Sequence, residues 1–520
     1  MGNEEDNSDF LKQKSQKFYS ELNKLDTTEK LNDKDDDNKS LSEKIQLKVS
    51  IGQIEKECSY QIRLFNIISG KKYPLNDISE CTIKNDDMTA ILNHRIIIRY
   101  YFEKEQPLFV EIIKNKLDNS NIYQINTTLG RVMGSRKNTL TLNISNSENE
   151  TLILEAEKLK QSEDILIIQF DIKTPKNSIS FSEANNKMYY EIYSDNLLYR
   201  SECLNDKGLF NPAKIPLGLF KNNNINIKFC KNTKKAKGDF NLTVKELING
   251  KIFDVIINGT PFQIISKCRI TKNFTFIDYL KAGVQIGLSV AIDFTRSNGY
   301  ASTEQSLHYI KGPEPNQYER AIYSCGNIVA YYDYDQLFPC FGFGAKINNK
   351  PYEIFNLNFK KNPNIKYIQG IIDTYHKTIN KVKLWGPTNF SPILKKVNEI
   401  IKNENNIFKY HILMILTDGL IDDLEKTIEE LVESSFLPLS VIIIGIGTED
   451  FSDMVALDAD KHPLVNSKGV EAKRDLVQFV PFLKYANNPE LLVNEVLAEI
   501  PRQLIDYYEQ KNLDPIKLVS

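Results

Sequence analysis

An aspartate, a threonine and a serine, separated from each other by single residues, follow an apolar run near the middle of the chain. Residues 288–292 are apolar apart from Ser289, which is typical of a strand buried on both faces of a parallel sheet. Asp293, Thr295 and Ser297 come directly after it. Alternate residues of an extended segment face the same side, so we expect these three oxygen-bearing side chains to converge. One carboxylate and two hydroxyls are hard oxygen ligands, which favour Mg²⁺ or Mn²⁺ over zinc.

Two later motifs supply the rest of a ligand set. A second apolar run, residues 411–417, ends at Asp418, and the loop of residues 384–390 offers the hydroxyl of Thr388. In an open α/β sheet, side chains at the carboxyl ends of the strands lie at the edge where ligands bind. The first motif alone has an alternative interpretation as a polar turn that caps the next helix. The three motifs in this order favour a metal site.

In this order the five residues resemble the metal-ion-dependent adhesion site of von Willebrand factor A domains. The surrounding sequence is similar to the copine version of that domain over residues 274–508. The segments that carry this similarity are residues 276–280, 283–286, 306–309, 337–339, 341–345, 477–482 and 496–501.

The resemblance implies a division of roles within the metal site. Asp293, Ser297 and Thr388 would bind the ion directly or nearly so, and Thr295 and Asp418 would complete the cage, in part through water. Mg²⁺ prefers an octahedron and retains water readily, so one position can be given to an incoming ligand. The resemblance therefore implies a partner protein that offers an Asp or Glu to the metal.

The remaining strands and helices of this region alternate, as they do in a doubly wound sheet. We expect strands over residues 337–344 and 439–447. The expected helices cover residues 318–332, 367–382, 392–403, 422–434 and 489–509. The last helix carries Leu492, Val496, Leu497 and Ile500 on one face, a stripe that we expect to pack on the sheet.

Composition limits the classes of function. A chain of 520 residues has room for about two to four domains. A net charge of −2 predicts no nucleic-acid partner and leaves any membrane contact to a local patch. Seven cysteines without a Cys-x-x-Cys pair argue against a zinc ribbon, a RING or a disulfide framework. No apolar run is long enough to span a bilayer, so we expect a cytoplasmic protein.

The N-terminal half has a different texture from the metal-site region. Residues 1–44 are polar and are interpreted as a tail, while short alternating strands follow in residues 45–155 and 156–272. The predicted fold class is therefore two antiparallel β-sandwiches followed by an α/β doubly wound A domain. We place that A domain at residues 273–510 and a second tail at 511–520.

Copines carry two C2 domains before the A domain, so the resemblance implies that both β-sandwiches are C2 domains. The family binds Ca²⁺ there through carboxylates on loops at one tip. The matching loops here, residues 55–59, 114–116, 185–187 and 230–233, carry lysines, and only Asp239 is clearly retained. Two ammonium groups about 4 Å from a divalent cation cost several kcal/mol. We therefore expect neither domain to bind Ca²⁺ in the family's usual way.

Two further features concern membrane binding. A loop of the second β-sandwich is crowded with lysines, each contributing about 1 kcal/mol near an acidic phospholipid surface, although a solvated loop is the alternative interpretation. These lysines are Lys228, Lys231, Lys234, Lys235 and Lys237. Gly2 follows Met1 as in a myristoylation signal, but Asp6 stands where that signal has Ser or Thr.

The resulting hypothesis is a non-enzymatic peripheral membrane adaptor of the plasma membrane or other cytosol-facing membranes, acting in signalling or trafficking. Its β-sandwiches would bind phospholipid, and its A domain would recruit a partner protein. The alternative is a soluble scaffold whose C2 domains bind proteins instead of lipid. A hydrolase using the two aspartates is not expected, because none of the five histidines adjoins either motif in sequence.

Overall fold

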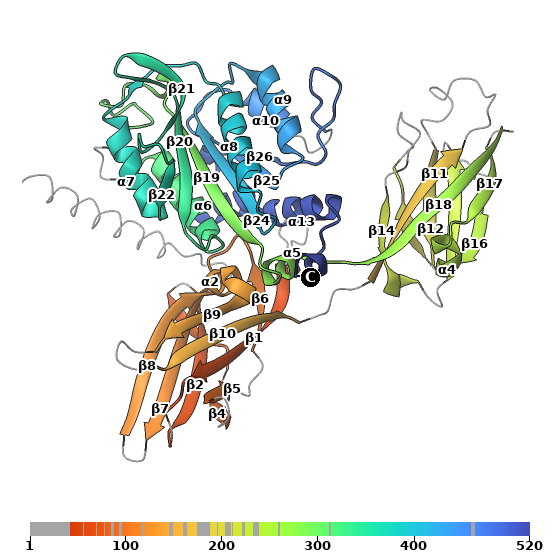
Figure 1. Cartoon of the computed structure of the whole chain (residues 1–520), viewed down its shortest axis with the longest axis horizontal. Helices are drawn as coiled ribbons and strands as arrows, with labels where there is room; N and C mark the ends of the chain where they lie inside the picture. Colours follow the sequence, from red (N-terminus) through yellow and green to blue (C-terminus); the bar gives the residue numbers. More distant parts are fainter. Residues whose placement is uncertain are drawn as a thin grey trace, which may run out of the picture. The chain divides into compact units, whose positions relative to one another are not determined.

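A computed structural model places the chain in two compact units, which are described separately (Figure 1). One unit comprises Met1–Leu159 and Phe276–Ser520, and the other comprises Lys160–Thr275. The structure describes residues 42–519 apart from residues 56, 69, 77–78, 85–87, 93–95, 117–118, 145–148, 160–163, 174–187, 195, 203–209, 211, 221–223, 232–238, 258–259, 311–313 and 459–462. The predictions made for Gly2, Lys234, Lys235 and Lys237 lie outside the described residues.

The N-terminal part of the first unit is an antiparallel β structure. Its strands run in the order β8-β7-β2-β4-β5-β1-β10-β9, with β3 beside β2 and β6 beside β1. Side chains alternate as a half-buried sheet requires: in β6, Ile96 and Ile98 are buried while Ile97 is exposed. The elements are β1 (Ser42–Gly52), β2 (Ser59–Ile68), β3 (Lys71–Pro74), β4 (Ser79–Lys84), β5 (Thr89–Leu92), β6 (Ile96–Tyr101), β7 (Pro107–Lys116), β8 (Asn119–Thr128), α2 (Leu129–Gly134), η1 (Arg136–Asn138), β9 (Thr139–Asn143) and β10 (Thr151–Lys158).

The second unit consists of two four-stranded antiparallel sheets, in the orders β14-β11-β18-β17 and β13-β12-β15-β16. Aromatic rings fill its core, where Phe170 packs edge-on against Tyr190, Phe229 and Phe253. The elements are β11 (Asp164–Lys173), β12 (Met188–Tyr193), β13 (Leu197–Arg200), β14 (Ala213–Pro216), η2 (Leu217–Leu219), β15 (Asn224–Lys231), β16 (Asp239–Thr243), α4 (Val244–Ile248), β17 (Ile252–Ile257) and β18 (Thr260–Lys272).

The C-terminal part of the first unit is the α/β domain, with strand order β21-β20-β19-β24-β25-β26. The four strand pairs between β20 and β26 in this order are parallel, and β21 pairs with β20 in the antiparallel direction. The predicted fold class is thus confirmed. The strands are β19 (Gln285–Asp293), β20 (Leu337–Ile347), β21 (Lys350–Asn356), β22 (Asn364–Lys366), β23 (Lys383–Leu384), β24 (Lys409–Thr417), β25 (Leu439–Gly445) and β26 (Val477–Pro481).

Helices pack on this sheet through apolar stripes. Ile393, Leu394 and Val397 of α8 share a core with strand residues Ile415 and Ile443. The helices are α5 (Phe276–Lys281), η4 (Arg296–Asn298), α6 (Gln317–Ala330), α7 (Ile368–Ile379), α8 (Ser391–Glu404), α9 (Leu424–Ser434), α10 (Ser452–Leu457), α11 (Phe482–Tyr485), α12 (Pro489–Leu497), α13 (Ile500–Gln510) and α14 (Pro515–Val519).

The expectation of one long helix over residues 489–509 is wrong. The structure divides it into α12 and α13. Pro501 lies in the first turn of α13, where its missing N–H costs nothing, whereas inside a continuous helix it would remove a hydrogen bond and clash with the preceding turn. The apolar stripe is nevertheless buried as expected, with Leu492, Val496, Leu497 and Ile500 at most 2% exposed.

Three elements extend beyond the domain boundaries expected from the sequence. Strand β1 begins at Ser42, inside the expected N-terminal tail. Strand β10 continues to Lys158 because it pairs with β1 along its whole length, past the boundary expected at residue 155. Helix α14 lies within the expected C-terminal tail, where its Leu518 is buried.

The β and α/β parts of the first unit share aromatic contacts. The hydroxyls of Tyr100 and Tyr332 are hydrogen-bonded, and the rings of Phe102 and Phe276 meet edge-on at 5.0 Å. Buried aromatic pairs of this kind contribute more than their buried area alone.

Candidate metal centre

Asp293 is fixed at both carboxylate oxygens. It is the last residue of β19, and its side chain is completely buried. Its Oδ1 accepts the backbone N–H of Thr295 at 2.7 Å, and its Oδ2 accepts the Thr417 hydroxyl at 2.7 Å. Because Thr417 ends the neighbouring parallel strand β24, the sheet itself sets the position of this carboxylate.

Asp418 reaches the same place from β24. The hydroxyl of Ser297 donates to Asp418 Oδ1 at 2.9 Å, and the hydroxyl of Thr295 lies 3.4 Å from the same oxygen. The hydroxyls of Thr295 and Ser297 are 2.9 Å apart. The structure therefore joins four of the five predicted residues, Asp293, Thr295, Ser297 and Asp418, although they come from segments more than 120 positions apart.

The electrostatics of this cluster favour a cation. Asp418 is 1% exposed, and its Oδ2 has no hydrogen-bond partner among the described residues. Burial, followed by the charge of Asp293, raises the pKa of Asp418 to about 7, and burial raises the pKa of Asp293. A divalent ion would ligate the unsatisfied oxygen and offset the repulsion of the two carboxylates. The residues present therefore fit a bound metal.

The type of ligand indicates which metal. Among the described residues, no group of three or more His, Cys, Asp or Glu side chains is arranged to hold a metal. A metal here would depend on two carboxylates and on hydroxyls. This all-oxygen set suits Mg²⁺ or Mn²⁺.

Thr388 lies on a loop that contacts the segment after β19 and the segment after β24. Thr295 forms an isolated parallel bridge with Trp385, and the Arg296 N–H donates to the Trp385 carbonyl at 2.9 Å. The Thr388 N–H donates to Asp422 Oδ2 at 2.7 Å. No hydrogen bond of the described residues joins the Thr388 hydroxyl to the other four residues, so its place in the ligand set stays a prediction.

Comparison with known proteins shows which family the chain belongs to. The family described as Copine matches residues 306–516. The chain is 33% identical over 462 residues to Copine-E of Dictyostelium discoideum, which covers 83% of this chain and 79% of the relative. The chain belongs to the copine family. The resemblance inferred from the sequence is thereby confirmed.

Solved structures resemble parts of this copine at low identity. Manganese-loaded TRAP of Plasmodium vivax is 13% identical with a TM-score of 0.26, over 41% of this chain and 74% of that chain. The paired C2 domains of extended-synaptotagmin 2 are 9% identical with a TM-score of 0.17, over 48% of this chain and 98% of that chain.

A buried histidine of this copine holds the end of strand β19, next to the candidate metal centre. One ring nitrogen of His308, Nε2, lies 2.8 Å from the Asp293 carbonyl, and the other, Nδ1, lies 2.7 Å from the Tyr375 hydroxyl. A carbonyl only accepts, so Nε2 donates and Nδ1 accepts from Tyr375. Burial lowers the pKa of His308 to about 3, which keeps the ring neutral. Both nitrogens are thus engaged in holding the end of β19.

Gly344 permits the close packing of the metal-site loop. Its φ is +70°, and a Cβ at this position would lie 2.2 Å from Thr295 Cγ2. Only glycine adopts this backbone conformation readily and leaves space for the threonine methyl. Sequence reasoning missed Gly344, His308, Thr417 and Asp422, although the position of Thr417 directly before Asp418 was a usable signal.

The predicted lysine loop is described only at its ends. The expectation that Lys228 belongs to the loop is wrong, because it lies within β15 and pairs with Asp239 of β16. Its Nζ is 4.6 Å from the centre of the Tyr193 ring. Lys231 ends β15 and Asp239 begins β16, and these two strands are antiparallel partners. The lipid-binding role of this loop stays a prediction.

Proposed function

We propose that this copine is a peripheral membrane adaptor that joins acidic phospholipid to a partner protein. The α/β domain would bind Mg²⁺ or Mn²⁺, and the ion would accept an Asp or Glu side chain of the partner. The observation that carries this proposal is the convergence of two buried carboxylates and two hydroxyls at one place. There Asp418 Oδ1 accepts from Ser297, while Asp418 Oδ2 has no hydrogen-bond partner among the described residues.

The proposed metal site has room for an incoming ligand. Mg²⁺ takes six ligands, and the described site offers two carboxylates and the hydroxyls beside them. The remaining positions would be filled by water or by a carboxylate from a partner, whose charge would also complement the ion. Recognition would then require both the metal and a single acidic side chain.

The arrangement supports binding better than hydrolysis. A metal-dependent hydrolase needs a base that can take a proton from water at the ion. His308 is the histidine hydrogen-bonded to Asp293, but it is buried, neutral, and engaged at both nitrogens. We therefore propose a non-enzymatic role.

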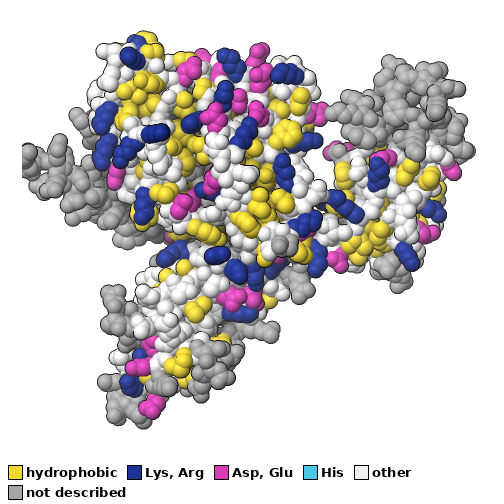
Figure 2. All heavy atoms as spheres, in the orientation of Figure 1, with side chains coloured by type: hydrophobic (Ala, Val, Ile, Leu, Met, Phe, Trp, Pro, Cys, Tyr) yellow, Lys and Arg dark blue, Asp and Glu magenta, His cyan; other side chains and the backbone are white. Residues whose placement is uncertain are grey.

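The membrane part of the proposal rests on family membership and on local charge. No helix in the described part of the chain is long and apolar enough to cross a bilayer. Over the α/β domain, the face drawn in Figure 2 mixes basic and acidic side chains. Lysines stand in the four segments whose sequence we matched to the calcium-binding loops of C2 domains, so we propose docking that does not need Ca²⁺.

Sedimentation with liposomes tests the membrane proposal. The full chain would be mixed with phosphatidylserine-containing vesicles in Ca²⁺ and again in EGTA, with Mg²⁺ present throughout. We expect equal binding in both. Binding only in Ca²⁺ would instead show a calcium trigger, and no binding in either would favour the soluble scaffold.

Affinity capture tests the proposed recruitment of a partner. Proteins retained by the full chain in Mg²⁺ but not in EDTA would be compared with those retained by a Thr388→Ala variant. We expect the metal-dependent set to be lost in the variant. Retention of the same proteins by both forms, with or without metal, would contradict a metal-mediated contact.

A further inference from the structure

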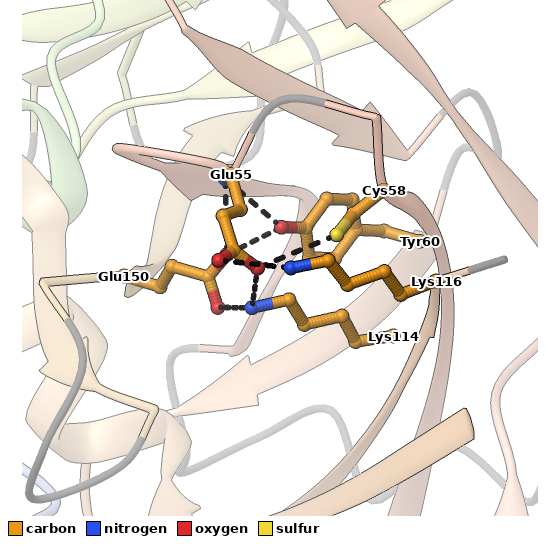
Figure 3. Close-up of polar contacts among 6 residues, drawn as sticks. All are labelled: Glu55, Cys58, Tyr60, Lys114, Lys116 and Glu150. Atoms are coloured by element: carbon orange, nitrogen blue, oxygen red, sulfur yellow. Dashed lines mark hydrogen bonds and ion pairs between the residues drawn. The ribbon is translucent and has the colours of Figure 1, made fainter. Parts of the chain in front are cut away.

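A lysine lies inside a cluster of polar side chains at one end of the first β domain (Figure 3). The cluster joins the segment after β1 to the starts and ends of β2, β7 and β10. Its members are Glu55, Cys58, Tyr60, Lys114, Lys116 and Glu150.

The ammonium group of Lys114 contacts two carboxylates from different segments. Its Nζ is 2.9 Å from Glu55 Oε2 and 3.2 Å from Glu150 Oε2. The side chains of Lys114 and Glu150 are only 6% and 5% exposed, whereas that of Glu55 is half exposed. A cation is therefore enclosed between two acidic groups that the sequence separates widely.

Other hydrogen bonds tie the same segments together. Glu150 Oε1 accepts the backbone N–H of Glu55 at 3.2 Å and also accepts the Tyr60 hydroxyl. The Glu55 N–H lies 3.2 Å from the Tyr60 hydroxyl as well. The position of Glu150 thus decides where the Glu55 segment lies, and Lys114 neutralises both carboxylates.

The charge states of Lys114 and Glu55 follow from these contacts. Burial alone would lower the pKa of Lys114, but the hydrogen bonds to Glu55 and Glu150 outweigh it and raise the pKa. The hydrogen bond from Lys114 is the largest influence that lowers the pKa of Glu55, to about 2. Both groups are therefore charged at neutral pH.

We propose that Lys114 is a tethered cation that closes this end of the first C2 domain in the place of a divalent metal ion. Two carboxylates from different segments face one enclosed cation here. Without that cation, a metal ion would be needed to bring them together. Because the chain supplies the charge itself, the loop order does not depend on Ca²⁺. This inference does not depend on the partner proposal, and it shares with the membrane proposal the premise that this end of the domain needs no Ca²⁺.

The degree of burial separates this cluster from an ordinary surface ion pair. Exposed pairs contribute little, because water solvates either partner when the other is removed. Removing Lys114 would leave the buried carboxylate of Glu150 beside that of Glu55 without this cation, which is strongly unfavourable. Lys116 offers a matched comparison, because it is 3.4 Å from Glu55 but its side chain is 57% exposed.

Cys58 is a natural reporter of this loop. Its Sγ lies 3.5 Å from Glu55 Oε2, and the residue is 3% exposed. Burial, followed by the hydrogen bond to Glu55, raises the pKa of the thiol. A buried thiol with a raised pKa reacts slowly with alkylating reagents, so opening of the loop would be measured as faster labelling.

The experiment measures alkylation of Cys58 in the full chain by peptide-resolved mass spectrometry. We expect the wild type to give the same rate in Ca²⁺ and in EDTA. Lys114→Met should label about tenfold faster or more, because loss of the ammonium group from the buried Glu150 carboxylate favours loop opening. Lys116→Met should remain close to the wild type, and Lys114→Arg should retain protection.

A carboxylate at position 114 tests the metal part of the inference. Lys114→Asp would present three carboxylates, so millimolar Ca²⁺ should slow Cys58 labelling in this variant. Failure of Ca²⁺ to slow it would overturn the claim that the ammonium stands in the place of a metal. A wild-type rate that changes with Ca²⁺, or equal rates for Lys114→Met and Lys116→Met, would overturn it as well. The wild-type rates in Ca²⁺ and in EDTA can be compared even if a variant fails to fold, and a difference between them would still overturn the inference.

Discussion

Replacement of Asp418 by asparagine should stabilise the metal-free protein and remove its response to metal. Two buried carboxylates, Asp293 and Asp418, share one site, and no residue in the described part of the chain hydrogen-bonds to Asp418 Oδ2. Asparagine keeps the acceptor that Ser297 uses and removes a negative charge. A metal ligand is expected to lower stability when the metal is absent and to be required for stabilisation when the metal is present. A side chain with a purely structural role is not expected to do both.

The magnitude follows from the pKa of Asp418. A rise from 3.8 to about 7 is about three units, which corresponds to a penalty of at most about 4 kcal/mol when the group is ionised above pH 7. The new amide group is itself buried and costs about 2 kcal/mol without a partner. The net gain at pH 8 in EDTA is therefore about 2 kcal/mol, or about 4–8 °C in Tm for a domain of this size.

Thermal unfolding of the full chain in EDTA and in Mg²⁺ provides the assay. At a hundredfold excess over its dissociation constant, the metal should stabilise the wild type by about 2.7 kcal/mol and the Asp418→Asn variant by almost nothing. The variant should therefore melt at the higher temperature in EDTA, and the wild type should melt at the higher temperature in Mg²⁺, by a small margin. A variant less stable than the wild type in EDTA, or one that gains equally from Mg²⁺, would refute this reasoning.

Three other changes test separate parts of the structure. Gly344→Ala should destabilise the α/β domain by about 2 kcal/mol or more and weaken its Mg²⁺ response, because the new Cβ would collide with Thr295; unchanged melting in both buffers would contradict this. Burial raises the pKa of Asp333 to about 7, so its destabilising effect is absent below about pH 4, grows between about pH 4 and pH 7, and is complete above pH 7. Asp333→Asn should accordingly gain stability relative to the wild type between pH 4 and 8, by at most about 4 kcal/mol, and a difference independent of pH would refute it. Phe170→Ala should cost the second unit about 3–5 kcal/mol while leaving the Mg²⁺ response of the α/β domain intact, as checked by two-step denaturation; loss of that response would contradict independent units.

Much of the α/β domain could be predicted because its central strands are largely apolar and its site residues come at or directly after their ends. Asp293 and Asp418 end up together for a topological reason: β19 and β24 are parallel neighbours, so their carboxyl ends share one edge. Strand alternation likewise predicted the β regions. The division between α12 and α13 was missed because the apolar stripe continues past Pro501 without interruption.

The supporting contacts could not be read from the sequence. His308 meets Tyr375 and the Asp293 carbonyl through tertiary packing, and no local spacing encodes such contacts. Lysine at position 114 indicated the loss of a calcium ligand. Its enclosure between Glu55 and Glu150 depends on how three separate segments meet.

Direct measurement of Mn²⁺ binding tests the central claim that the α/β domain holds a metal. Free Mn²⁺ would be followed by electron paramagnetic resonance during titration of the full chain and of an Asp293→Asn variant. Trp385, the single tryptophan of the chain, adjoins Thr295 and gives a parallel fluorescence signal. We predict one Mn²⁺ site in the wild type, competed by Mg²⁺ and lost in the variant. No bound Mn²⁺ in the wild type, or equal binding by both proteins, would contradict the account.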